Sequence, residues 1–568
     1  MSGQDDLAIE KALEGEWARI YEEVYVKKRC FNLPEQKSES GIPLKSFYGP
    51  RDTAEIPFED IGAPGCYPYT RGIYPLSYQY QPWMTQQIHG FGLPEDTEAR
   101  EKLLEKEGMT GFGGARVAFI EPDVATCYAF DPDDPAAKGM VGNCGASYAT
   151  EEDIDILCRS YDLSRDRIGF STKVSCLPLL AVYLVYAEKR GYKPHDLNGQ
   201  SQNRRKITWL GQNSRDHQPR EQLKLQVELI KYCVENMPRW NHTNLCGYIA
   251  GENCATPAQE MAWLLSEAVE LVESCIEAGL DPEAVIPRFS AQMHLGMDFF
   301  EEIAKLRAFR RLWAKTMKER FGVKKASSQQ FRIHVHMGGM NLTAQQPLNN
   351  IARTTLQALA AVLGGTQSIH TTSYDEAISL PSEEAVTTAL RVNQVILHES
   401  GTAKVSDPLA GSYYMEWLTT ELEKKARELV EEVETKGGCT KCMENGWWWE
   451  LFDRQIRQYR RDIDEGKKIM VGVNKFQKEE TLAVSAFSID QEKAEKTAVE
   501  RIKKWKENRE HKKVTEALKN IERAAKNFES AAQAGLLMPT LIQAARDRCT
   551  IGEMTKVLFD VYGVAYPY

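Results

Sequence analysis

Three clusters of polar side chains stand out as groups that could line a ligand site. The first, residues 71–91, is rich in Tyr, Gln and Trp, whose amide and phenol groups need hydrogen-bond partners when they are buried. The second is the pair His334 and His336. The third is residues 366–376, where Glu376 is the carboxylate that we expect at a ligand hydroxyl. Such side chains suit a long polar ligand, although a satisfied surface loop explains the first cluster equally well.

Metal binding is the alternative chemistry for the histidine pair. Residues two apart on a strand share a face, so the imidazoles of His334 and His336 point the same way. Zinc needs three or four ligands and no third is identifiable nearby, so a hydrogen-bonding lining is favoured. Cys439 and Cys442 lack a second cysteine pair or a neighbouring histidine, and they follow Gly437-Gly438, where a helix should end. We expect these two thiols on a turn.

The composition is that of a large globular protein. With 568 residues, 42% hydrophobic and 27% charged, the chain can bury a core of several layers. Its net charge of -10 is opposite to that of a phosphate-backbone binder, so nucleic acid is not an expected partner. The sequence has neither an apolar run that could span a membrane nor a signal-peptide pattern, and we expect a soluble cytoplasmic protein. Most of the 13 cysteines lie in apolar stretches, which is typical of reduced, buried thiols.

Short apolar runs alternate with longer helical patterns between about residues 61 and 400. The runs that predict strands are 115–119, 167–171, 245–249, 286–290, 331–335 and 368–371. Thr256-Pro-Ala-Gln259 predicts the start of a helix, because it combines an N-cap hydroxyl, a proline and a capping-box glutamine. Repeated strand-helix units need a parallel sheet covered by helices, and no glycine-rich nucleotide motif favours a Rossmann fold. The sequence therefore predicts an α/β fold, a (β/α)8 TIM barrel over residues 61–400.

Two segments of different character flank this barrel. Residues 1–60 mix charged helical sequence with four prolines, too interrupted to fold alone, and we expect an N-terminal arm that wraps a partner. Residues 401–568 form a helical C-terminal region, with long charged helices predicted at 415–436 and about 488–530. The basic stretch 501–506 has acidic neighbours, so we interpret it as a solvated face.

From about residue 60 onward, the chain resembles the large, substrate-binding chain of the adenosylcobalamin-dependent acyl-CoA mutases, the methylmalonyl-CoA mutase family. The stretches that carry this resemblance are Arg71-Gly72, Tyr74, Pro82-Trp83, Gln87, Gly90-Phe91, Arg288-Phe-Ser290, Asn349-Asn-Ile-Ala-Arg353, Gly365-Thr-Gln-Ser-Ile-His370, Asp375-Glu-Ala377, Glu399-Ser-Gly401, Gly411-Ser-Tyr413 and Val471-Gly-Val-Asn-Lys475. The resemblance implies an isomerase whose barrel is threaded by the pantetheine arm of coenzyme A. It also implies a corrin ring over the C-terminal mouth and a radical 1,2-shift of the acyl thioester.

The resemblance also implies roles for individual residues. The CoA and thioester contacts fall on Tyr74, Ser171, Gln202, Arg288, Ser290 and Gln367, and a histidine of the catalytic lining on His334. Contacts to the cofactor fall on Gly90, Cys144, Met340 and Glu376, of which Glu376 bonds the adenosyl ribose and Met340 replaces a family tryptophan. The family's cobalt-binding motif D-x-H-x-x-G does not occur, which implies a separate small cobalamin-binding subunit. A G-protein chaperone is a further implied partner.

Three positions at the reacting centre depart from methylmalonyl-CoA mutase. Ile88 replaces a tyrosine, Gln212 replaces the arginine that pairs the substrate carboxylate, and Ile249 replaces the histidine that donates to the thioester carbonyl. A neutral amide cannot replace a bidentate ion pair, so the resemblance implies a substrate other than methylmalonyl-CoA. Ile88 with Gln212 resembles the 2-hydroxyisobutyryl-CoA mutase branch. Ile249 departs from both branches and favours a bulkier or more apolar acyl group.

Three functional hypotheses follow. We prefer a mutase for a bulky aryl- or alkylmalonyl-CoA and its succinyl-CoA partner, with the carboxylate held by Arg204, Arg205 or Arg215. The alternatives are a 2-hydroxyisobutyryl-CoA-type mutase and a non-catalytic barrel that acts as a binding scaffold. Retention of Gln367 and Glu376 favours an active enzyme, because a scaffold has no physical need for a coherent ligand lining. A hydrolytic barrel enzyme needs a metal or an activated nucleophile, and neither is identifiable.

Overall fold

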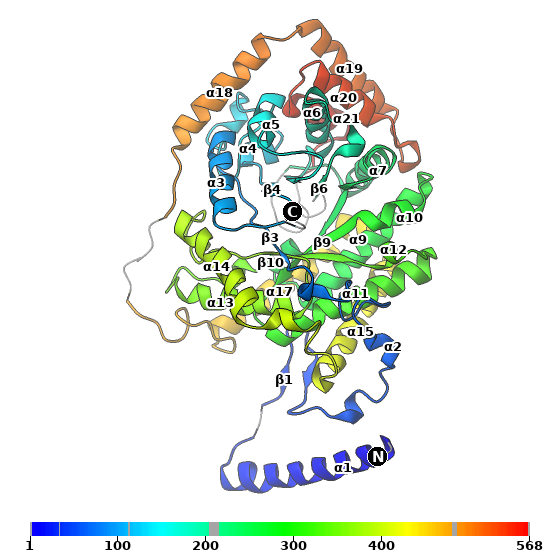
Figure 1. Ribbon diagram of the computed structural model, residues 1–568, viewed down its shortest axis with the longest axis vertical. Helices are drawn as coiled ribbons and strands as arrows, with labels where there is room; N and C mark the ends of the chain where they lie inside the picture. Colours follow the sequence, from blue (N-terminus) through cyan, green and yellow to red (C-terminus); the bar gives the residue numbers. More distant parts are fainter. Residues whose placement is uncertain (1–2, 33, 112–113, 204–214, 480–485, 566–568) are drawn as a thin grey trace.

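Parallel strands in two sheets form the centre of the molecule. The computed structural model (Figure 1) describes residues 3–32, 34–111, 114–203, 215–479 and 486–565. One sheet has the order β3-β11-β10-β9-β8 and the other the order β4-β5-β6-β7. Their strands are β3 (Met84–Thr85), β4 (Val117–Ile120), β5 (Arg167–Thr172), β6 (Gly199–Asn203), β7 (Trp240–Asn241), β8 (Thr243–Cys246), β9 (Phe289–Leu295), β10 (Arg332–Met337) and β11 (Ser368–His370).

The two sheets join into one ring. On one side, β7 pairs with β6 and β8 pairs with β9, and only His242 separates β7 from β8 in the chain, so these two strands share one position. On the other side, a parallel bridge links His89, just after β3, to Ile120 of β4. There the His89 amide donates to the Phe119 carbonyl at 3.2 Å, and the His89 carbonyl accepts from the Glu121 amide at 3.0 Å. The predicted eight-position barrel is confirmed.

A long helix follows each strand position and covers the outside of the ring. These helices are α3 (Pro94–Lys106), α5 (Glu151–Cys158), α6 (Cys176–Lys189), α7 (Pro219–Asn236), α9 (Pro257–Glu277), α11 (Phe299–Phe321), α13 (Asn349–Leu363) and α14 (Glu383–Glu399). The predicted cap of α9 is confirmed, since the Thr256 hydroxyl accepts from the Gln259 amide and the Gln259 side chain accepts from the Thr256 amide at 2.9 Å. These crossovers place the carboxyl ends of all strands at one mouth of the barrel.

Two predicted strands have different bounds. The run 245–249 is a strand only to Cys246, and residues 248–252 form the short helix α8 (Tyr248–Glu252). The turn lets the Glu252 carboxylate reach the amides of Gly339 and Met340, at 2.7 and 3.1 Å. The run 286–290 begins with the turn η8 (Ile286–Arg288), because Pro287 has no amide hydrogen for a strand ladder. The strand there runs from Phe289 to Leu295 instead.

The C-terminal helices pack back onto the barrel. They are α15 (Tyr413–Thr435), α16 (Cys439–Glu444), α17 (Trp447–Asp464), α18 (Gln491–Glu507), α19 (His511–Lys526), α20 (Leu537–Arg546) and α21 (Ile551–Tyr562). Because α20 and α21 cover the outer side of α6, that helix is apolar on nearly every face (Figure 1). Within the described ranges no helix is long and apolar enough to cross a membrane.

Two expectations for this region need correction. The single helix expected over 488–530 is two helices, α18 and α19, which bend at Asn508 so that α19 packs against α20 and α21. The Cys439 and Cys442 thiols lie buried on the helix α16 and form no disulfide, and they are not on a turn, because the helix restarts directly after Gly438. All 13 cysteines are free thiols and most are buried, as predicted. In the basic stretch, Lys506 pairs with Asp131 and Asp133 of the barrel.

The N-terminal segment has two parts. Its helix α1 (Gly3–Ile20) projects away from the barrel at the bottom of Figure 1 and continues as a short irregular helix, η1 (Tyr21–Lys28). The hairpin of β1 (Gln36–Lys37) and β2 (Pro43–Leu44) lies on the barrel's helices, where the Ser38 hydroxyl donates to Glu301 of α11 at 2.9 Å. The second part therefore lies over the chain's own surface, whereas α1 presents exposed Leu13 and Trp17.

Candidate functional site

A narrow cavity lies inside the ring of strands. Its volume is about 40 Å3, and its walls come from β3 and from every strand from β5 to β11. The lining is mostly amide, hydroxyl, imidazole and guanidinium groups, from Met84, Gln86, Arg167, Gln200, Gln202, Asn241, Asn244, Ser290, Arg332, Ile333, His334, Gln367 and Ser368. The cavity has room for a few water molecules, so the long ligand that the sequence predicts must push side chains aside.

Four of the predicted site residues meet in this axial cavity: Gln202, Ser290, His334 and Gln367. Hydrogen bonds hold them to neighbouring strands. The Gln367 side chain accepts from the Ile333 amide at 2.8 Å, and the Ser290 hydroxyl accepts from the Asn244 amide group at 3.0 Å. His334 Nδ1 lies 2.7 Å from the Ser368 hydroxyl. The side chain of Ser171 is buried on β5, outside the set that lines the cavity.

Three guanidinium groups gather at the amino-terminal mouth of the barrel. Arg167 and Arg332 are the first residues of β5 and β10, and Arg288 directly precedes β9. Burial lowers the pKa of all three, and Arg332 and Arg288 lower the pKa of Arg167 further, to about 10. Tyr74, which is exposed, lies within electrostatic reach of Arg167 and Arg332. Clustered like charges of this kind favour an anionic ligand group.

A stack of rings occupies the opposite, carboxyl-terminal mouth. The ring centroids of Tyr248 and His336 are 4.0 Å apart, and those of His336 and His370 are 3.9 Å apart. A chain of amides reaches this stack from β6, because Gln202 donates to Gln292 at 3.1 Å and Gln292 Nε2 lies 2.9 Å from His336 Nδ1. His334 and His336 share a face of β10 as predicted, but they serve two levels, the axial cavity and this ring stack.

The backbone of Ile88 fixes the state of one ring in this stack. Its amide donates to His370 Nδ1 at 2.8 Å. A ring nitrogen that accepts a hydrogen bond carries no proton, so His370 is neutral and has its hydrogen on Nε2. Ile88 itself is half-buried, whereas Ile249 is buried in the main apolar core at 5% exposure. The roles assigned to both isoleucines stay predictions.

The expected carboxylate-binding residues fall in two places. Gln212, Arg204 and Arg205 lie outside the described residues. Arg215 lies between two phenylalanine rings, 4.5 Å from the centroid of Phe130 and 4.3 Å from that of Phe559. That position puts Arg215 at the contact between the barrel and α21.

Two carboxylates flank a glycine turn at the same carboxyl-terminal mouth. The turn is η9 (Gly339–Asn341), and a side chain at Gly339 would come within 4 Å of both Glu252 and Glu376. Glu376 is exposed at the rim, where the surrounding walls still desolvate its carboxyl and raise its pKa to about 7, with Glu252 and Asp375 adding to the effect. A carboxyl that is part protonated near neutral pH can donate a hydrogen bond to a hydroxyl or accept one from it.

The other predicted cofactor residues lie near this rim. A side chain at Gly90 would come 2.4 Å from the Glu121 carbonyl, so the fold itself requires glycine there. Cys144 is exposed on the loop that packs against this segment, and it has a positive φ of 56°. Met340 lines a second, wider cavity. Contacts of these three residues with a cofactor stay predictions.

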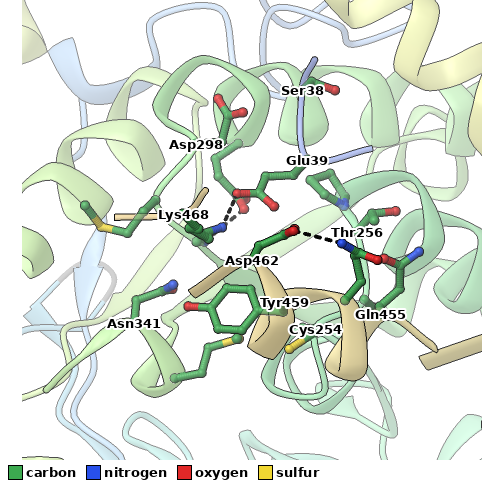
Figure 2. A pocket seen from close by; sticks show the side chains of 18 of the residues that line it. Ser38, Glu39, Cys254, Thr256, Asp298, Asn341, Gln455, Tyr459, Asp462 and Lys468 are labelled. Atoms are coloured by element: carbon green, nitrogen blue, oxygen red, sulfur yellow. Dashed lines mark hydrogen bonds and ion pairs between the residues drawn. The ribbon is translucent and has the colours of Figure 1, made fainter. Parts of the chain in front are cut away.

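The second cavity is polar and has a volume of about 640 Å3. It lies between the N-terminal hairpin, α17 and the carboxyl end of β9 (Figure 2). An ion pair of Lys468 with Glu39 crosses one side, and Gln458 donates to Asp462 at 2.8 Å on the other. Among the described residues no group of three His, Cys, Asp or Glu side chains is arranged to hold a metal ion.

Sequence reasoning missed the arginine pair Arg167 and Arg332 and the ring-stack residues Tyr248 and Gln292. The arginines had a signal, because Arg167 is the first and Arg332 the second residue of a predicted strand run, and parallel strands begin at one mouth. For Tyr248 and Gln292 the sequence held no comparable signal, since they are brought to His336 from two separate elements, α8 and β9.

The sequence of this chain is similar to a known protein family and to several of its members. Residues 37–564 match the family model described as methylmalonyl-CoA mutase. The 2-hydroxyisobutanoyl-CoA mutase large subunit of Aquincola tertiaricarbonis is 36% identical over 539 residues, which cover 93% of each chain. Mitochondrial methylmalonyl-CoA mutase of Mus musculus is 34% identical over 554 residues, 98% of this chain and 72% of the relative. Methylmalonyl-CoA mutase of Rhizobium meliloti (strain 1021) is 34% identical over 540 residues, 93% of this chain and 74% of the relative.

Proposed function

Since this chain belongs to the methylmalonyl-CoA mutase family, we propose that it is the large, acyl-CoA-binding subunit of an adenosylcobalamin-dependent acyl-CoA mutase, an isomerase. The observation that carries this proposal is the polar axial cavity, which begins at Arg167 and Arg332 and includes Gln202, whose side chain is linked to the ring stack through Gln292. A barrel interior is usually filled by branched aliphatic side chains, so an interior of amides and imidazoles supports a ligand along the axis. The relatives named above are mutases of CoA thioesters.

The charge distribution supports one orientation of the ligand. The three arginines at the amino-terminal mouth suit the phosphates of coenzyme A, because a guanidinium binds phosphate through paired hydrogen bonds. Gln86, Gln200 and Asn241 in the cavity can pair with the amides of a pantetheine chain. The acyl thioester then reaches the ring stack at the other mouth. Because the cavity is narrow, binding must move these amides, and a larger axial channel is expected in the complex.

At the acyl end, the described residues offer hydrogen-bond donors and an apolar wall. His370 is held neutral by the Ile88 amide and presents Nε2–H, while Ile88 contributes an aliphatic side chain. This pairing favours an acyl group with a carbonyl and a branched or bulky apolar tail. We therefore propose an aryl- or alkylmalonyl-CoA as the substrate rather than methylmalonyl-CoA. The alternative substrate is 2-hydroxyisobutanoyl-CoA, which has a smaller acyl group. The similarity to a 2-hydroxyisobutanoyl-CoA mutase large subunit supports this alternative.

The carboxyl-terminal mouth fits the cofactor that the family implies. Glu376, with a pKa of about 7, can bond a ribose hydroxyl, and the glycine turn beside it leaves the rim without side chains at Gly338 and Gly339. Adenosylcobalamin, when bound, supplies the radical that starts the rearrangement. The part of this chain is to bind and orient the thioester, to hold the His370 proton on Nε2, and to keep water from the closed barrel.

We propose two protein partners. The relative named as a large subunit supports a small subunit, which would carry the cobalamin. The helix α1 offers a docking surface for it, because Ile9, Leu13, Trp17 and Ile20 are exposed along this helix, which projects from the body. We propose residues 1–60 as the arm, 61–400 as the barrel and 401–568 as the helical region. We propose a G-protein chaperone as the second partner. We also propose that the protein is cytoplasmic.

One reconstitution tests the function. The chain is mixed with a small cobalamin-binding subunit and adenosylcobalamin, and turnover is measured with alkylmalonyl-CoA, phenylmalonyl-CoA, 2-hydroxyisobutyryl-CoA and methylmalonyl-CoA. We expect turnover of a bulky or branched substrate and none of methylmalonyl-CoA. Efficient turnover of methylmalonyl-CoA contradicts the proposed acyl pocket. Binding of CoA thioesters without any turnover would instead favour the non-catalytic scaffold.

The variant Ile249→His refines this test. We expect it to gain no methylmalonyl-CoA activity, because Gln212 still leaves the substrate carboxylate without an ion-pair partner. Appearance of that activity would show that another residue anchors the carboxylate.

A further inference from the structure

A buried pair of ionisable side chains lies directly behind Ile88. His89 and Glu101 form an ion pair, and each side chain is only 6% exposed. Two charges are costly to bury, so such a pair persists only where its geometry is well satisfied. The proposed function assigns neither residue a role.

The backbone of His89 is fixed at the closure of the barrel. Its amide and carbonyl both bond to the β4 segment, at 3.2 and 3.0 Å. Successive residues of an extended chain point to opposite sides, so His89 faces outward, toward Glu101 of α3, while Ile88 is on the other side. The pair therefore ties the end of β3 to the helix that follows it.

Both nitrogens of the His89 imidazole have a polar neighbour. Nδ1 lies 3.1 Å from the carbonyl of Gln87, and Nε2 faces Glu101. Burial alone would lower the pKa of His89, and Arg100 acts in the same direction. The Glu101 carboxylate and the Gln87 carbonyl outweigh both and raise it. The His89 side chain thus lies between the Gln87 carbonyl and α3 and contacts both.

Other charged groups face the same cluster from neighbouring elements. Tyr161 is buried beside Glu101 and lies 3.5 Å from Glu105. The Arg116 guanidinium lies 4.1 Å from the centroid of the Tyr161 ring and pairs with Glu105. The ion pair is therefore one part of a buried charge network between α3 and the barrel wall.

The Ile88 peptide unit links the His89 ion pair to the ligand site. Segment 87–89 is held by the His89 side chain on one side and by β4 on the other, and Ile88 lies between these anchors. The Ile88 amide donates to His370 Nδ1, and the His370 ring contacts the His336 ring, with centroids 3.9 Å apart. A shift of this segment would move the hydrogen bond that keeps the His370 proton on Nε2.

We propose that His89, through its ion pair with Glu101, is a positioning residue for the acyl end of the site: it holds the Ile88 amide on His370 Nδ1 and the Ile88 side chain at the pocket wall. The statement about acyl binding rests on the proposed mutase function. The statement about His370 does not.

The test uses one pair of variants that separates positioning from stability. His89→Leu alone leaves Glu101 buried without a partner and is expected to lower the melting temperature. His89→Leu with Glu101→Leu removes both charges and is expected to restore it, because an apolar pair of similar volume replaces a buried ion pair at little cost. His89→Gln, which can still donate to Glu101, serves as the conservative variant.

Two measurements are made on each variant. Nitrogen chemical shifts of the His370 ring, assigned with His370→Asn, report which ring nitrogen carries the proton. Calorimetry gives the affinities for isobutyryl-CoA and for CoA. In the double leucine variant we expect a mixture of His370 tautomers and a loss of about fivefold in the preference for isobutyryl-CoA over CoA, while the melting temperature recovers. His89→Gln should retain most of the His370 signature.

Recovery of the wild-type His370 tautomer and acyl preference together with the melting temperature would overturn the proposal, because His89 would then act only in stability. Failure of wild-type protein to bind either CoA ligand would count against the proposed function instead. The His370 measurement would still decide the positioning role in that case.

Discussion

The phenol ring of Tyr248 lies against the imidazole of His336, with ring centroids 4.0 Å apart and planes only 11° from parallel. This contact ties α8, the helix that also contains Ile249, to β10. The ring centroids of His370 and His336 are 3.9 Å apart. The rings of Tyr248, His336 and His370 therefore form one group of contacting rings at the carboxyl-terminal mouth. An amide chain from β6 and the Ile88 amide bond to the edges of this group of rings.

Removal of the Tyr248 ring should weaken acyl binding more than binding of CoA itself. We expect Tyr248→Ala to lower the affinity for isobutyryl-CoA about fivefold, as loss of one aromatic contact of roughly 1 kcal/mol would, and Tyr248→Phe to change it little. Calorimetric titration with isobutyryl-CoA and CoA measures both. Tyr80, whose ring is 80% exposed, provides the control variant Tyr80→Ala. Equal loss of affinity for both ligands would contradict a role at the acyl end.

The arginines at the amino-terminal mouth are predicted to bind the phosphates of coenzyme A. Arg332→Ala should lower the affinity for CoA at least about tenfold, because a hydrogen bond between charged groups is among the stronger ones. The same variant should bind an S-acyl pantetheine, which has no phosphate, as wild type does. Titrations at low and high salt should show a weaker salt dependence for the variant.

Arg159→Ala is the matched control, since Arg159 is half-exposed and pairs with Glu98 on the surface. Unchanged CoA affinity in Arg332→Ala would place the phosphates elsewhere.

Local patterns in the sequence were enough to predict the barrel and part of its lining. The cap of α9 and the strand runs depend on neighbouring residues: the cap was confirmed, and each run overlaps a strand, although the strands at 245–249 and 286–290 have other bounds. His334 and His336 were placed on one face by alternation alone. The sequence could not predict the partners of His336, because Tyr248 and Gln292 lie far from it in the chain and meet it only when the ring of strands closes. Likewise, the end of the strand at Cys246 depends on contacts of Glu252 with η9, which no local pattern records.

Gly90 should tolerate no side chain, whatever its relation to a cofactor. A methyl group there would approach the Glu121 carbonyl to 2.4 Å, and backbone atoms cannot move aside as a side chain can. We expect Gly90→Ala to destabilise the protein by about 1–3 kcal/mol, measured by denaturant unfolding. Gly15→Ala is the control, because a methyl group at Gly15 meets no atom within 4 Å and alanine favours the helix. Equal stability of the two variants would disprove the close approach at Gly90.

Glu376 should make stability depend on pH near neutrality. The fold raises the pKa of its carboxyl from 4.5 to about 7, mainly by burial and then through Glu252 and Asp375. Between these values the folded chain keeps a proton that the unfolded chain has lost, so the free energy of unfolding falls as pH rises from about 4.5 to about 7 and levels off above. Glu376→Gln lacks this contribution, and its melting temperature relative to wild type should rise across that window. Asp123 and Glu301, whose pKa values burial raises to about 6 and about 7, titrate in both proteins and cancel in the difference. A difference that stays constant across the window would mean that the Glu376 carboxyl is fully ionised at the rim, and it would then only accept a hydrogen bond from a ribose hydroxyl.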